Sequence, residues 1–246
     1  MNTLVHKVWV NSIKHLAVLE GATVTRIAMQ DSYKIVYKGG NGEMIEKKSR
    51  FIATIIPISK EEDALSFIDL MKKKYWDASH NCSAYVLGPN NELERCSDDG
   101  EPSKTAGRPM LDVLLNEGIH NTAVVVTRYF GGTLLGTGGL VRAYQSATKE
   151  GLKNCTIIEK SYGKQLCIHT DYNGLGKIQY VAGTLNLNVL STEFTDMVKI
   201  TLLIPPDIIG FVKKKIQEAT NGKAKFVELD DVYYAKTQDN ILIFPV

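Results

Sequence analysis

The chain has 246 residues, which is enough for two domains of ordinary size, each with its own hydrophobic core. Its formal net charge of +2 gives no overall electrostatic argument for nucleic acid, and no apolar run reaches the ~20 residues of a membrane span. None of the four cysteines has CxxC spacing, which argues against a zinc ribbon or a thioredoxin motif and favours a reducing cytoplasm.

Residues 1–28 are interpreted as an N-terminal extension with an unusual composition. Acidic residues are absent until Glu20, whereas three basic residues are present. Transit peptides have such a composition. A short extra element, or an upstream start codon with Met29 as the original start, is the simpler interpretation.

The first domain is expected over residues 29–157. Strands are predicted at Tyr33–Tyr37 and Glu43–Ile56, with a turn at the glycine-rich segment Gly39–Gly42 between them. A helix is predicted over about 60–75, because apolar residues recur there at helical spacing. Acidic residues at its start and lysines at its end also agree with the helix dipole.

The middle of this domain is predicted to begin with two paired strands, Cys82–Leu87 and Leu93–Cys96. The polar loop Ser97–Arg108 then leads into a helix. Pro109 fits the first turn of that helix, where its missing N–H costs little, and Gly118 can end it.

The most informative segment is Arg128–Tyr144, where a strand over 121–130 meets a glycine-rich turn and a helix over about 139–153. The segment contains five glycines and two flanking arginines: Gly131, Gly132, Gly136, Gly138, Gly139, Arg128 and Arg142. Glycine permits close backbone approach, and the first N–H groups of a helix have no partner within it. The segment therefore predicts an anion-binding turn, although a tight turn that packs strand on helix would use the same residues. The Walker and GxGxxG patterns are both absent, which argues against ATP hydrolysis and dinucleotide binding.

The loop before Pro109 carries acidic and then basic groups. Its acidic residues are Asp98, Asp99 and Glu101. They could hold a hard cation, form an ordinary solvated turn, or pair with Arg128 and Arg142. The residues suited to an anion are Lys104, Thr105 and Arg108. Since no EF-hand spacing is present, we predict neither a metal nor a cofactor.

Two further groups of residues allow more than one interpretation. His80 and Cys82 share one face of a predicted strand, so they could form a nucleophile pair, but a packed thiol beside a hydrogen-bonded histidine is commoner. Tyr129, Phe130 and Tyr144 could stack on a base or pack in the core. We predict no catalytic residue.

A second domain is expected over residues 161–246, after a short linker at 155–161. The predicted elements are a strand at Lys164–Thr170, a helix at Leu175–Leu185, strands at Val189–Thr195 and Met197–Ile204, a helix at Ile208–Thr220 and a strand at Ala224–Leu229. This βαββαβ order is that of a ferredoxin-like fold.

Four blocks of sequence, in this order, resemble those of the YigZ/IMPACT family: Lys48–Ile52, His80–Tyr85, Ser97–Pro102 with Thr105–Pro109, and Arg128–Tyr144. The resemblance implies an α+β protein whose N-terminal β/α two-layer domain is similar to the second domain of a small-subunit ribosomal protein. It also implies a ferredoxin-like C-terminal domain, and the pair resembles domains IV and V of elongation factor G. The eukaryotic relatives are translational regulators that act by binding proteins.

These observations together predict a cytoplasmic, non-catalytic binding module associated with translation. It would recognise RNA, the ribosome or an acidic partner through the glycine-rich turn and the arginines, and no membrane partner is expected. One alternative is an enzyme that acts on a phosphorylated or carboxylated small molecule, and another is a pure protein-interaction domain. The oligomeric state stays open.

Overall fold

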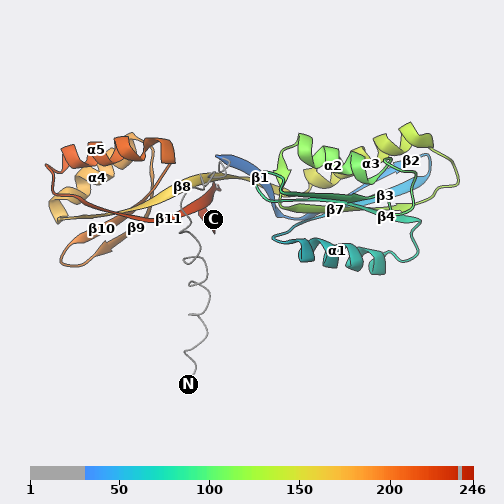
Figure 1. The fold of residues 1–246 in the computed structure, drawn as a ribbon, viewed down its shortest axis with the longest axis horizontal. Helices are drawn as coiled ribbons and strands as arrows, with labels where there is room; N and C mark the ends of the chain where they lie inside the picture. The colour runs from blue at the N-terminus through green and yellow to red at the C-terminus, as the bar shows by residue number, and fades with distance from the viewer. Residues whose placement is uncertain (1–30, 238–239) are drawn as a thin grey trace, which may run out of the picture.

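The computed structural model describes residues 31–237 and 240–246, so the predicted extension 1–28 lies outside the described residues. Within this part, five α-helices and two β-sheets form two side-by-side halves (Figure 1). The predicted α+β fold class is confirmed. None of the helices in the described part is long and apolar enough to cross a membrane.

The N-terminal half is built on a five-stranded sheet covered by helices on both faces. The strands, in spatial order, are β2 (Gly40–Glu46), β3 (Ser49–Pro57), β7 (Thr122–Tyr129), β4 (His80–Leu87) and β5 (Leu93–Ser97). One face packs against α2 (Gly107–Asn116) and α3 (Gly136–Lys153), and the other packs against α1 (Glu61–Lys74) (Figure 1). The N-terminal half was predicted to have two layers, but it has three, because α1 covers the second face of the sheet. The helix predicted over 60–75 is confirmed.

The first hairpin differs from its prediction. The segment Gly39–Gly42 is not the turn, because β2 already begins within it. The turn is made by Lys47 and Lys48, which have φ values of 44° and 67°. A Cβ at Gly42 would overlap the backbone nitrogen of Gly151 in α3. The glycines of β2 therefore allow the strand to lie directly against the helix.

The C-terminal half has the predicted βαββαβ order, with α4 and α5 on one face of the sheet (Figure 1). Its elements are β8 (Thr156–Thr170), α4 (Tyr172–Thr184), β9 (Asn188–Phe194), β10 (Val198–Ile204), the short 3₁₀ helix η1 (Pro206–Ile208), α5 (Ile209–Ala219) and β11 (Lys225–Lys236). A strand that was not predicted, β12 (Ile241–Pro245), pairs with β11. The C-terminal half has its own hydrophobic core, which lies between the sheet and helices α4 and α5.

One strand joins the two halves where a linker was expected. Residues 156–161 of the expected short linker form the first part of β8, which runs without interruption over 15 residues. Along one edge, β8 pairs first with β1 (Ser32–Lys38) and then with β10, while β11 pairs with residues 161–169 of β8. A two-residue strand, β6 (Ile119–His120), lies on the far side of β1. A seven-stranded sheet therefore extends across both halves.

Candidate functional site

A cavity of about 520 Å³ lies beside the N-terminus of α3. We call it the α3 cavity. It is lined by the end of the loop before β4, the loop after β5, the end of β7 and the start of α3. The lining residues are Ser79, His80, Gly100, Glu101, Pro102, Arg128, Phe130, Leu134, Leu135, Gly136, Thr137 and Leu140. Three predicted site residues therefore meet here: Glu101, Arg128 and Gly136.

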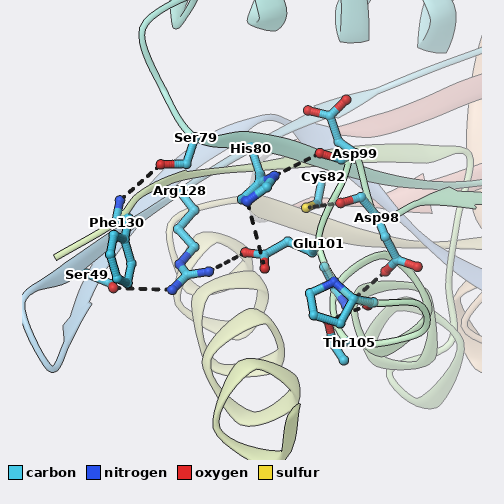
Figure 2. A network of polar contacts seen from close by, with 12 residues as sticks. Ser49, Ser79, His80, Cys82, Asp98, Asp99, Glu101, Thr105, Arg128 and Phe130 are labelled. Atoms are coloured by element: carbon cyan, nitrogen blue, oxygen red, sulfur yellow. Dashed lines mark hydrogen bonds and ion pairs between the residues drawn. The ribbon is translucent and has the colours of Figure 1, made fainter. Parts of the chain in front are cut away.

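Arg128 and Glu101 form a buried ion pair, which Figure 2 shows. Both residues line the α3 cavity. The Arg128 Nη1 donates to Glu101 Oε1 over 2.6 Å, and the two residues are only 5% and 8% exposed. The guanidinium also lies 5.5 Å from the ring centres of both Phe51 and Phe130. Its Nε is buried and has no hydrogen-bond partner in the described residues. Of the two interpretations of Arg128, pairing with an acidic residue of the loop is therefore the one observed. The Nε–H donor takes no part in this pairing.

The ion pair continues into a buried hydrogen-bond network. The Tyr144 hydroxyl donates to Glu101 Oε1 over 2.8 Å, and the Cys82 sulfur lies 3.3 Å from that hydroxyl. The Cys82 sulfur is also 3.0 Å from the Asp98 carbonyl oxygen, to which the thiol can donate. Burial raises the pKa of both the Cys82 thiol and the Tyr144 hydroxyl well above their usual ranges. Because the thiolate is the reactive form, this raised pKa disfavours a nucleophilic role for the thiol and favours packing.

His80 is oriented by the same loop. Its Nδ1 lies 2.9 Å from the Asp99 carbonyl oxygen, which can only accept, so this nitrogen carries the proton (Figure 2). The Nε2 then faces Glu101 Oε2 at 3.9 Å. His80 therefore presents Nε2 at the wall of the α3 cavity, beside the buried ion pair.

The three acidic residues of the loop, Asp98, Asp99 and Glu101, contact different parts of the structure. Asp98 Oδ1 accepts from the backbone N–H groups of Ala106 and Gly107 at 3.0 and 2.8 Å, which caps the start of α2. The carboxylate of Asp99 accepts from the backbone N–H of Asn81 and from the Lys72 ammonium, each at 2.7 Å. Only Glu101 faces the cavity. Within the described residues, no group of three or more His, Cys, Asp or Glu side chains is arranged to hold a metal ion.

Gly131 serves close packing. Its N–H donates to the Ser49 hydroxyl over 3.1 Å, and the same hydroxyl lies 3.5 Å from Arg128 Nη2. A Cβ at Gly131 would overlap the backbone of Lys48. The absence of a side chain therefore lets the glycine-rich turn rest on the hairpin between β2 and β3.

The remaining glycines shape the start of α3. Gly132 and Gly136 have φ values of 82° and 70°, a region that favours glycine. The helix begins at Gly136, three residues before the predicted position, so Gly138 and Gly139 lie in its first turn. Leu135 at the N-cap provides no side-chain hydrogen bond. The first backbone N–H groups of this 18-residue helix are therefore without a side-chain cap, next to the α3 cavity.

The predicted basic residues lie in different surroundings. Arg142 is exposed on α3, near Gly138, and has no ion pair among residues that the structure describes. Arg108 pairs with Asp112 at 2.8 Å, and Lys104 is exposed. Thr105 is buried, with its hydroxyl bonded to a backbone carbonyl. Lys104, Thr105 and Arg108 are thus not among the residues that line the α3 cavity.

The sequence interpretation missed the apolar part of the site. Leu134 and Leu135 line the cavity from within the glycine-rich turn, and Leu134 is 82% exposed. Ser49 and Ser79 hold the turn in place through their hydroxyls, Ser79 by accepting from the Phe130 N–H at 3.3 Å. The available signal was the leucine pair itself, because apolar residues in a polar turn need a reason to be there.

Removing the Tyr144 hydroxyl tests the buried network. We expect Tyr144→Phe to lower the free energy of unfolding by about 1–3 kcal/mol, because Glu101 loses a buried donor. The measurement is urea unfolding followed by circular dichroism. Tyr180→Phe is the matched control, since Tyr180 is exposed on α4. Equal unfolding midpoints for the two variants would show that the bond to Glu101 contributes nothing.

Each half of the chain matches a known protein family. The Impact N-terminal domain family matches residues 47–152, and a domain of unknown function, DUF1949, matches residues 168–223. The chain is 38% identical to the IMPACT family member YvyE of Bacillus subtilis (strain 168), over 87% of this chain and 98% of the relative. It is 30% identical to the IMPACT family member YigZ of Escherichia coli (strain K12), over 75% of this chain and 92% of the relative. A solved structure titled "Crystal structure of an hypothetical protein" matches with a TM-score of 0.52 and 28% identity, covering 82% of this chain and 98% of that chain.

Proposed function

This chain belongs to the IMPACT family, and from that membership we propose that it is a translation-associated binding protein that recognises RNA at the α3 cavity. One observation carries the RNA part of the proposal. The uncapped N-terminus of α3, a buried arginine with a spare donor and a half-exposed aromatic ring all border the same cavity. Phosphate and base are the two parts of a nucleotide that such groups recognise.

The phosphate would lie at the start of α3. The positive end of the helix dipole and the free N–H groups of the first turn both favour an anion there. Arg142 is exposed nearby without an ion pair in the described part of the chain, so its charge is available for a second phosphate. Arg128 is already neutralised by Glu101, so its role is to hold Glu101 and Ser49 in place beside the cavity.

The base would stack on Phe130. This ring is 49% exposed and borders the cavity, while the Arg128 guanidinium lies 5.5 Å from its centre. Leu134 offers a second exposed apolar surface at the same rim. Stacking contributes about 1–3 kcal/mol per base and tolerates different bases. The aromatic ring is why we favour RNA over an acidic protein surface.

The same geometry supports binding without turnover. The Cys82 thiol is held protonated by burial, and the Glu101 carboxylate is committed to Arg128 and Tyr144. The carboxylates of Asp98 and Asp99 accept from backbone N–H groups outside the cavity. This arrangement therefore supports the non-catalytic interpretation over a metal-assisted or nucleophilic reaction.

The proposal predicts that Phe130→Ala weakens RNA binding. We expect the dissociation constant for ribosomes or structured RNA to rise by about 5- to 100-fold, since a stacked base loses its partner.

Arg142→Ala should weaken binding less and reduce the slope of log K against log salt by about one, since a single phosphate contact is removed. Filter binding over a salt series measures both effects.

Matched controls separate these effects from nonspecific charge or folding effects. Phe211→Ala removes an equally exposed ring on α5, which is 50% exposed, and Arg95→Ala removes an exposed arginine on β5. Both variants should bind RNA like the unchanged protein. The RNA proposal fails if the unchanged protein shows no binding to ribosomes or structured RNA at low salt, or if Phe130→Ala and Phe211→Ala have the same affinity.

A further inference from the structure

A second cavity, of about 450 Å³, lies where the two halves of the molecule join. We call it the junction cavity. It is bordered by β1, by the end of β3, by β8 and by β12, and Figure 1 shows β1 and β8 running between the halves. Ligand sites in proteins occur preferentially at such domain junctions, and they usually have volumes of about 300–1,000 Å³.

The walls of the junction cavity are mainly apolar and well supported. Tyr33, Ile35 and Ile58 are each less than a tenth exposed and line it. The Tyr33 ring packs edge-on against Tyr233 and His120, with ring centres 5.0 and 5.5 Å apart. Because packing fixes this ring, the part of the wall that it forms is in place before any ligand arrives.

Lys160 supplies the single charge of the junction cavity. The lining residues include this one cation and no aspartate or glutamate. Its ammonium lies 4.0 Å from the ring centre of Phe244 and 5.8 Å from that of Tyr33. Across the described residues, no carboxylate forms an ion pair with it. Burial lowers the pKa of Lys160 because no anion compensates for its lost hydration.

We propose that the junction cavity binds a small organic monoanion, an aromatic or branched aliphatic carboxylic acid that carries no amino group. Its carboxylate would pair with the Lys160 ammonium, and its apolar part would lie against Tyr33, Ile35 and Ile58. An amino acid fits less well, since no acidic residue in the lining can pair with its ammonium. This site is separate from the α3 cavity and does not depend on RNA binding.

Three small molecules of almost the same shape test the charge requirement on the full-length protein. They are 3-phenylpropanoate, which has the carboxylate alone, 3-phenylpropanamide, which is neutral, and L-phenylalanine, which adds an ammonium. Titration followed by ligand-observed NMR gives the three dissociation constants. We expect the propanoate to bind at least roughly tenfold more tightly than either of the other two, because only the propanoate makes a charge-assisted hydrogen bond without also burying an unpaired ammonium.

Variants at Lys160 place the ligand in the cavity. Lys160→Met should weaken binding of the propanoate by roughly tenfold or more, and Lys160→Arg, which keeps the charge, should bind it within a few-fold of the unchanged protein. Lys34→Met is the matched control, because Lys34 is exposed on β1 and does not line the cavity. Lack of binding, equal affinity for acid and amide, or an unchanged affinity in Lys160→Met would each overturn the proposal. Should the methionine variant not fold, the comparison of the acid with the amide on the unchanged protein decides it.

Discussion

Arg128→Met should lower the free energy of unfolding by about 3–5 kcal/mol, the range for removing one partner of a buried ion pair. The loss is large because Glu101, whose side chain is only 3% exposed, would be left without its cation. Methionine keeps much of the length of the side chain, so the change mainly removes charge and hydrogen bonding. Urea unfolding, followed by circular dichroism and extrapolated to water, gives the value.

A second variant and a control identify the cause of that loss. Arg128→Met combined with Glu101→Gln should recover part of the stability, since the buried negative charge is then absent. Arg108→Met should change stability by less than about 1 kcal/mol, because its ion pair with Asp112 is exposed to solvent. If Arg128→Met proves as mild as Arg108→Met, the buried pair is not a principal stabilising contact.

Gly131→Ala should lower the free energy of unfolding by an amount at or above the upper end of the ~1–3 kcal/mol that overpacking costs. The new methyl group would overlap the backbone of Lys48, and backbone cannot move aside as a flexible side chain can. Thermal unfolding at matched protein concentration measures the loss. The expected result also includes a displaced glycine-rich turn, visible as shifts in the amide NMR signals of residues 130–136.

Gly176→Ala provides a control of opposite sign. Gly176 lies inside α4, and a Cβ there would meet nothing within 4 Å. Alanine should therefore stabilise the protein by about 0.5–1 kcal/mol, because glycine is a poor helix residue. Two glycine-to-alanine changes with similar effects would contradict the assignment of Gly131 to close packing.

Most of the fold was predictable from local patterns. The α1 helix, the β4–β5 hairpin and the βαββαβ order of the second half all follow from periodicity and turn residues. The turn of the first hairpin was not predictable, because glycine occurs both in turns and at close backbone contacts. Gly42 is of the second kind, and the residue that it contacts, Gly151 in α3, is more than one hundred positions away. The strand conformation of the linker segment was also not predicted, since nothing local to residues 156–161 shows that β1 will pair with them.

The candidate site was predictable only in outline. The glycine-rich turn, Arg128 and Glu101 stood out by composition, and the structure brings Arg128 and Glu101 together. The sequence alone left the partner of Arg128 open, because the two residues are 27 positions apart. It also grouped Lys104 and Arg108 with the turn. The Asp98 carboxylate instead ties this loop to the start of α2, where Arg108 finds Asp112.

The uninterrupted course of β8 has a consequence for how the molecule folds. A state with only the C-terminal half folded would leave residues 156–160 of β8, which pair with β1 and not with β10 or β11, without a neighbouring strand. Such a partly folded state exposes unpaired backbone and is therefore costly. We therefore expect the shared strand to favour unfolding of the two halves in a single transition.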